Sequence, residues 1–331
     1  MGRKLRLTVA CGDYEIVRAL KEGTVKADGL ELIFLTGMGS REFISRMTRR
    51  LEFDVAEIGV TTYVTSKAQG GPLTAIPVFL HRRFRHGFVF TNTAAGVHAP
   101  KDLVGKKVGG NIGPAANAWI RGILDEHYGV SHERYVWVCE PREATEFPNR
   151  ARIPMELAPA NLSLEDMLVE GTLPALISRA LPRALLNGDT RIGHLFPDYK
   201  EVELDYFQKA GIFPIMHLVA VKQEIIDKYP WVATNLVAAF EQSKQIAYRR
   251  LLNPRIVPMA WYTWAQQEQK RILGPDPWAY GLNAANRNNL DTLLRYMVKQ
   301  GLVERKVSVD ELFAESDPPD MFRHPEDELR L

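Results

Sequence analysis

The sequence contains little cysteine, no long apolar run and almost no net charge. Its two cysteines, Cys11 and Cys139, lie far apart and match no metal-binding spacing, so we expect two separate core thiols, with a single disulfide as the alternative. No run of about 18 apolar residues occurs, so no membrane-spanning helix is expected. The net charge of +2, without a basic arm, argues against a nucleic-acid partner.

The bulk composition is that of a globular protein. Hydrophobic residues make up 46% and charged residues 25% of the 331 positions, and this length favours two domains. The N-terminus begins with basic residues, but Asp13 interrupts its short apolar part, so it has no signal-peptide core. Arg6 stands where a myristoylation signal needs Ser or Thr. We therefore expect a cytoplasmic protein.

The most distinctive segment is 80–92, which reads LHRRFRHGFVFTN. Within it, five basic side chains fall in six positions: His81, Arg82, Arg83, Arg85 and His86. Apolar runs flank this cluster, so it reads as a short link between two core strands. Unpaired buried charge costs several kcal/mol. The cluster therefore predicts a pocket for an anion, such as a carboxylate held by an arginine fork.

Strands and helices alternate along the first part of the chain. Apolar patterns predict strands at 5–11, 30–35, 53–58 and 73–78. Helices are expected at 14–22, 41–51 and 61–69, the second with Ser40 as its N-cap. Such alternation predicts a parallel sheet that is covered on both faces.

A second α/β unit follows, and the chain then returns to the first. We expect helices at 115–128, 164–170, 224–229, 232–252 and 284–300. Strands are expected at 135–139, 175–178 and 217–221, and an extended segment at 202–207. The predicted domains are a discontinuous lobe I, 1–92 plus 206–331, and a lobe II, 93–205. The tail from Ser316 is expected at the surface.

Several phrases follow one another in the order of a known family: DVAEIGVTTYV (54–64), FRHGFVF (84–90), KDLVGKKVG (101–109), AWIRGILDEHYGV (118–130), GIFPIMHLVAV (211–221) and YPWVATNLVAAFEQSK (229–244). Together they resemble the 4,5-dihydroxyphthalate decarboxylases. The resemblance implies an α/β, two-lobed type II periplasmic-binding-protein-like fold with a ligand cleft between the lobes. It also implies a cytoplasmic carboxy-lyase of phthalate degradation, with a small aromatic carboxylate as its substrate.

The chain departs from this family's pattern at two places that should face the cleft. Relatives usually carry a Tyr-Gln pair where this chain has NIGPAAN, from Asn111 to Asn117, and often an Asp where it has GTLPA, residues 171–175. These departures predict that the ring substituents recognised can differ.

Candidate substrate-binding residues lie in the basic cluster and at the strand ends. Arg82 and Arg85 are expected to clamp carboxylates, with a solvated, salt-bridged loop as the alternative, whereas Arg83 is expected to point away. Arg179 follows a buried strand of the second unit and is expected to face the cleft from that side.

Further candidates lie where helices begin. Asp13 and Tyr14 follow the first strand and can touch a ligand, with helix capping as the alternative for Asp13. Asn111 and Asn117 flank the start of a helix whose free N–H groups suit an anion.

Three residues are candidates for catalysis. His86 and His217 lie near the two inter-lobe strands and can exchange protons near neutral pH, or can serve as structural histidines. Glu57 lies at the end of the third strand, where it can act as a base, orient a histidine, or pair with an arginine.

The implied chemistry needs no cofactor, because a ring hydroxyl can accept the electrons released on decarboxylation. No metal is expected, since no histidine has a second ligand at a metal spacing, although a divalent metal remains open.

Two other readings remain. One is a solute-binding protein or cytoplasmic sensor for a small aromatic carboxylate. The other is a thiamine-precursor synthesis protein, which would carry a histidine- and cysteine-rich iron site that this chain lacks. Apolar positions near Trp261, Trp264 and Trp278 suggest a homo-oligomer, or simple packing of helices.

Overall fold

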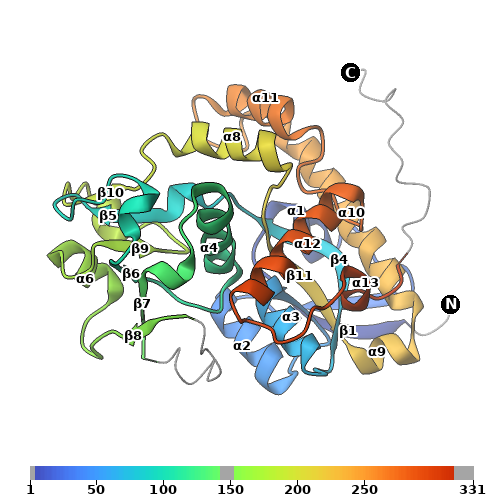
Figure 1. Ribbon diagram of the computed structural model, residues 1–331. Helices are drawn as coiled ribbons and strands as arrows, with labels where there is room; N and C mark the ends of the chain where they lie inside the picture. Colours follow the sequence, from blue (N-terminus) through green and yellow to red (C-terminus); the bar gives the residue numbers. More distant parts are fainter. Residues whose placement is uncertain (1–3, 142–152, 317–331) are drawn as a thin grey trace.

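The computed structural model describes residues 4–141 and 153–316, which form two lobes around two β-sheets (Figure 1). One sheet has five strands in the order β2-β1-β3-β11-β4, and the other has six in the order β10-β5-β9-β6-β7-β8. In Figure 1 the six-stranded sheet lies on the left and the five-stranded sheet on the right, with helix α4 (Ala115–Tyr128) between them.

The first sheet is mixed rather than wholly parallel. Its strands are β1 (Leu5–Ala10), β2 (Leu30–Phe34), β3 (Val55–Gly59), β4 (Leu73–Arg82) and β11 (Ile215–Lys222). β1 pairs in parallel with β2 and β3, as the strand–helix alternation predicts. β11 runs antiparallel to both β3 and β4, because it returns from the second lobe and inserts between them.

The second sheet takes in one strand that we assigned to the first lobe. Its strands are β5 (Val89–Asn92), β6 (Lys107–Gly109), β7 (Val136–Cys139), β8 (Met155–Leu157), β9 (Ala175–Ile177) and β10 (Ile192–His194). β5 pairs antiparallel with β9 and β10, so residues 89–92 belong to the second sheet. The chain therefore crosses between the sheets in the link between β4 and β5, before the predicted boundary.

Helices pack around both sheets. Those of the first half are α1 (Glu15–Lys21), α2 (Ser40–Arg50), α3 (Val60–Ala68), α4, α6 (Leu164–Glu170) and α7 (Arg183–Leu186). Those of the second half are α8 (Tyr199–Ala210), α9 (Gln223–Lys228), α10 (Trp231–Leu251), α11 (Tyr262–Leu273), α12 (Ala284–Lys299) and α13 (Val309–Leu312). Short 3₁₀ turns are η1 (His86–Phe88), η2 (Pro100–Leu103) and η3 (His132–Arg134). The N-cap of α2 is Gly39, not Ser40.

The segment 202–207 is helical, so its predicted extended conformation is wrong. It lies within α8, which also crosses the predicted boundary at residue 206. Val202 and Tyr206 both pack on the core, and residues four apart share one face of a helix. Aromatic and β-branched residues are common in strands, but here this helical spacing decides.

Helix α4 joins the two lobes. Ten consecutive residues of it are buried, from Ala115 to Leu124. The Trp119 indole donates to the backbone oxygen of Ile215 at the start of β11 (2.9 Å), and Arg121 donates to Gln300 (2.8 Å). Both cysteines are buried and neither is in a disulfide, which confirms the expected core thiols. Within the described ranges, no helix is long and apolar enough to cross a membrane.

Candidate active site

A buried carboxylate is the centre of the candidate site. Glu57 is fully buried on β3 and accepts three hydrogen bonds. The donors are the backbone N–H of Gly12 (2.7 Å), the Tyr14 hydroxyl (2.6 Å) and Nδ1 of His217 (2.5 Å). Three predicted site residues therefore meet, although they come from three separate stretches of the chain.

The strand pairing explains why these side chains meet. β1 and β11 flank β3, and His217 pairs with Gly59 while Val219 pairs with Glu57. Residues two apart share one face of a strand, so His217 and Glu57 project from the same side. The pairing of β11 with β3 therefore brings the His217 ring to Glu57.

A glycine makes room for the tyrosine. A Cβ on Gly12 would lie 2.6 Å from Cε2 of Tyr14, closer than real contacts allow. Because Gly12 has no side chain, the phenol ring of Tyr14 can lie over its backbone, while the N–H of Gly12 donates to Glu57. The tyrosine, the glycine and the carboxylate fit as one unit.

The electrostatics favour an ionised Glu57. Burial raises the pKa of this carboxyl, but the hydrogen bond and charge of His217, with the bonds from Tyr14 and Gly12, outweigh it and leave the pKa below its usual value. Burial and the neighbouring carboxylate raise the pKa of the Tyr14 phenol, so its hydroxyl stays protonated and donates. Of the His217 ring, Nδ1 binds Glu57, which leaves Nε2 to meet a substrate.

His81 also belongs to this site, although the sequence analysis gave it no role. Its ring lies edge-on to His217, with centroids 5.0 Å apart, and stacks with Tyr14 at 6.4 Å. Burial, together with the charges of His217 and Arg83, lowers the pKa of His81 to about 3, so the ring is neutral. Its buried Nδ1 has no partner among the described residues. β4 runs on to Arg82, past the predicted end at residue 78, and this extension places His81 beside β11.

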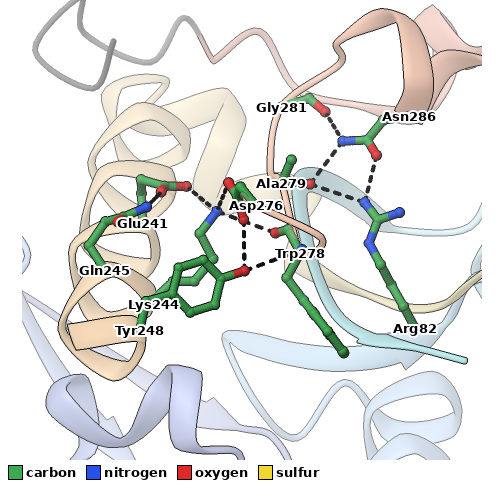
Figure 2. Close-up of polar contacts among 10 residues, drawn as sticks. All are labelled: Arg82, Glu241, Lys244, Gln245, Tyr248, Asp276, Trp278, Ala279, Gly281 and Asn286. Carbon is green, nitrogen blue, oxygen red and sulfur yellow. Dashed lines mark hydrogen bonds and ion pairs between the residues drawn. The ribbon is translucent and has the colours of Figure 1, made fainter. Parts of the chain in front are cut away.

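Arg82 does not join this site. It is 6% exposed and donates to Oδ1 of Asn286 (2.5 Å) and to the backbone oxygens of Ala279 and Phe213. Figure 2 shows Arg82 beside Asn286, in a region that also holds the buried Lys244 and its partner Asp276. Its donors hold the segment before α12 instead of a substrate, which corrects the predicted clamp.

Arg85 reaches the second lobe. Its side chain is 1% exposed, donates to the backbone oxygen of Ser178 (2.5 Å) and lies against the Phe88 ring, 4.4 Å from the centroid. Burial, then the charge of Arg83, lowers the pKa of Arg85 to about 9, so it is a cation at neutral pH. Arg179 contributes to the same shift, which places its charge nearby.

We expected Arg83 to point away from the site. It is exposed, and its guanidinium lies 5.1 Å from the centroid of the Phe88 ring, the ring that Arg85 also contacts. Its charge contributes to the lowered pKa of His81. Arg83 therefore lies within electrostatic reach of the site.

His86 lies in an apolar enclosure, which argues against its predicted catalytic role. It is fully buried, and the rings of Tyr128, Phe196 and Tyr206 surround it at centroid distances of 6.0, 5.2 and 5.3 Å. Burial and the charge of His127 lower the pKa of His86 to about 4, and neither ring nitrogen has a partner in the described structure. Residues 86–88 form a 3₁₀ turn, not the start of a strand, and this turn directs His86 inward.

The second lobe contributes the segment 111–117, which leads into helix α4. Thr61 of α3 donates to the backbone oxygen of Gly113 (2.7 Å), which brings segment 111–117 next to the end of β3. Asn117 is buried, donates to the backbone oxygen of Asn111 (2.6 Å) and leaves Oδ1 unpartnered among the described residues. This segment therefore borders the site.

Asp13 lies at the surface. Its side chain is 98% exposed and pairs with Lys21 (3.2 Å). The N-cap of α1 is Tyr14, with no side-chain capping bond, so Asp13 does not cap this helix. It contacts neither Glu57 nor His217 in the described hydrogen-bond network.

The described residues offer no group of three His, Cys, Asp or Glu side chains placed to hold a metal ion. The functional groups that meet are a carboxylate, a phenol and two imidazoles, with the charges of Arg83 and Arg85 within reach of His81. Together they can bind an anion and transfer a proton.

Comparison with known proteins identifies the family. The chain is 31% identical, over 323 residues, to the 4,5-dihydroxyphthalate decarboxylase of Comamonas testosteroni, covering 94% of this chain and 96% of the relative. The chain belongs to the 4,5-dihydroxyphthalate decarboxylase family. The enzyme of the same name from Pseudomonas putida is 30% identical over 213 residues, covering 62% of this chain and 82% of that protein.

Broader similarities agree with the fold of this decarboxylase family. The family described as NMT1/THI5 like matches residues 15–142. A putative periplasmic sulfonate-binding protein, SsuA from Methylobacillus flagellatus, aligns with a TM-score of 0.55 at 13% identity, over 96% of this chain and 93% of its own. The desulfurization enzyme DSZB aligns with a TM-score of 0.51 at 14% identity, over 96% and 97%. The decarboxylase-family chain thus has the two-lobed fold of type II periplasmic binding proteins, as expected.

Proposed function

We propose that this protein is a decarboxylase of a hydroxylated aromatic carboxylic acid, with 4,5-dihydroxyphthalate as the first candidate substrate. The observation that carries the proposal is the contact between Glu57 and His217, within a chain of the decarboxylase family. A buried carboxylate on Nδ1 fixes the imidazole so that Nε2 can deliver a proton. A binding protein needs no such proton donor.

The reaction requires a place for the electrons of the breaking bond. The hydroxyl para to the leaving carboxylate releases its proton to solvent as its electrons shift toward the carboxyl-bearing carbon. That carbon takes a proton, and the ring becomes a keto-like intermediate. The C–CO₂ bond then breaks, its electron pair restores the aromatic ring, and the phenol regains its proton. The net change is one proton added and one CO₂ released.

We assign the roles as follows. His217 supplies the proton to the ring carbon, and Glu57 orients it and stabilises its charged form. Tyr14 holds Glu57 in place from the other side. Arg85 binds the carboxylate that stays on the ring, because strong binding of the leaving carboxylate would stabilise the ground state.

The proposal includes no cofactor, since the ring hydroxyl itself serves as the electron sink. A divalent metal remains the alternative, and chelation tests it. Activity that survives dialysis against EDTA supports the proposal, and loss of activity that a metal restores contradicts it.

The decisive experiment measures CO₂ release and identifies the product by mass, with a panel of hydroxylated benzoates and phthalates. Release from 4,5-dihydroxyphthalate or a near relative is the expected result. A raised melting temperature with the ligand recovered unchanged would instead indicate a binding protein or sensor.

The same proposal places the protein in the cytoplasm, as a homo-oligomer that degrades phthalate-type compounds. Two buried cysteines that form no disulfide suit a reducing compartment. Trp261 and Trp264 are 76% and 56% exposed, which suits a subunit contact. Cell fractionation and light scattering test these two points.

A further inference from the structure

Arg83 has no ion-pair partner among the residues that the structure describes. Its side chain is exposed, it rests against the Phe88 ring, and it forms no hydrogen bond or ion pair with any residue that the structure describes. Exposed arginines often stay solvated, so this alone is not a site. The surroundings of Arg83 are what distinguish it.

The first of these surroundings is a second arginine. Arg85 contacts the same Phe88 ring, and its buried Nε has no partner in the described structure. Neither arginine forms an ion pair with a described carboxylate. The negative charge of Glu203 raises the pKa of Arg85, but this carboxylate accepts from the Gly87 N–H (3.0 Å). Two guanidinium groups on one ring repel each other, and an anion between them would relieve this repulsion.

The second is the direction of the strand end. Arg83 directly follows β4, whose residue His81 lies against His217, while Arg82 turns to Asn286. The backbone N–H of Arg83 donates to the oxygen of Pro214 (3.1 Å), which fixes this residue close to the start of β11.

We propose that Arg83 and Arg85 together form a subsite for the retained carboxylate of a substrate with two carboxylates. Arg85 is the buried member, and Arg83 is the exposed member that favours rings carrying this carboxylate over rings that lack it. A guanidinium offers parallel donors that match a carboxylate, and two of them can bind both of its oxygens. The inference rests on the proposed function for the aromatic ring, but its test needs no turnover.

The test compares two probes that differ by one carboxylate. Calorimetry gives the dissociation constants of 3,4-dihydroxybenzoate and of catechol for the wild-type protein and for Arg83→Gln. We expect the wild type to bind 3,4-dihydroxybenzoate more tightly than catechol. Arg83→Gln should weaken binding of the carboxylate probe about 10- to 100-fold and leave binding of catechol unchanged.

Arg134→Gln is the matched control. Arg134 is also exposed, but it precedes β7 at the edge of the second sheet opposite the strand ends of the site, so both affinities should stay the same. Equal losses for both probes in Arg83→Gln would overturn the subsite, as would an unchanged affinity for 3,4-dihydroxybenzoate. A wild type with no preference for the carboxylate probe would overturn it too.

The two proposals fail separately. A carboxylate-specific loss in a protein that releases no CO₂ supports the subsite and removes the decarboxylase. CO₂ release without a carboxylate-specific loss supports the decarboxylase and removes the subsite.

Discussion

Glu57 and His217 stand 160 residues apart in the chain, yet Oε1 of the carboxylate lies 2.5 Å from Nδ1 of the imidazole. The contact exists because β11 returns from the second lobe and pairs beside β3. A strand that pairs along eight residues holds such a contact more firmly than a loop does. The histidine is thus fixed by the sheet itself, while Nε2 stays free for chemistry.

The first prediction concerns the proton donor. His217→Asn should lower turnover about 100- to 10,000-fold, the usual contribution of a positioned acid or base, because asparagine cannot deliver the proton. Substrate binding and the melting temperature should change little. His98→Asn, at an exposed loop position, serves as the control in the CO₂ assay. Turnover close to that of the wild type in His217→Asn would move the donor elsewhere.

The second prediction concerns the charge of Glu57. Its pKa in the folded protein lies below the ordinary 4.5, so ionised Glu57 stabilises the fold above about pH 4.5 and this stabilisation is lost as the pH falls further. Glu57→Gln cannot ionise at this position. Its free energy of unfolding at pH 7 should be about 1–3 kcal/mol lower than that of the wild type. Urea titrations should show the two proteins converging below pH 4.5. A constant difference down to pH 3 would contradict an ionised Glu57.

Local sequence patterns predicted the elements better than the contacts between them. The helix over residues 115–128 and the strand over 175–178 follow from periodicity alone, and the structure has both within a residue. Glu57 was placed at a strand end, where ligands of α/β sheets bind. Its partner could not be singled out, since His86 and His217 look alike in sequence. Only tertiary packing shows that one faces Glu57 and the other a ring of aromatic side chains.

The arginine cluster is a second case in which the sequence could not predict the contacts. The cluster indicated an anion site, but the face of each side chain depends on where β4 ends. The strand continues to Arg82 because β11, whose Ile215 pairs with Arg82, supplies hydrogen-bond partners from far along the chain. That pairing places Arg82 in the core, where it donates to Asn286, while Arg83 beyond the strand end is exposed.

The third prediction separates Arg82 from Arg85. Arg82→Gln should lower the free energy of unfolding by about 1–3 kcal/mol, since it breaks a buried bond to Asn286, and should barely change the affinity for 3,4-dihydroxybenzoate. Arg85→Gln should weaken that affinity at least tenfold. Calorimetry with 3,4-dihydroxybenzoate and urea unfolding give both quantities for both variants. A carboxylate-specific loss of affinity in Arg82→Gln would restore Arg82 to the site.

The fourth prediction uses the buried His86 as a pH reporter. Its pKa falls from 6.5 in the unfolded chain to about 4 in the fold, so the native protein binds fewer protons and loses stability as the pH drops from 6.5 toward 4. The loss from this one residue is on the order of 3 kcal/mol. His86→Phe keeps a ring among Tyr128, Phe196 and Tyr206 but does not titrate, so it should resist acid better by about that amount.

Urea unfolding at pH 7, 6, 5 and 4 measures the difference between His86→Phe and the wild type. The exposed His98→Asn is the control, whose difference should stay flat. His86→Phe should also keep its turnover, because the enclosed ring does not reach a substrate. If His86→Phe folds normally but loses turnover, His86 is again a candidate proton donor. If the stabilities of His86→Phe and the wild type change in parallel with pH, His86 is charged inside the fold.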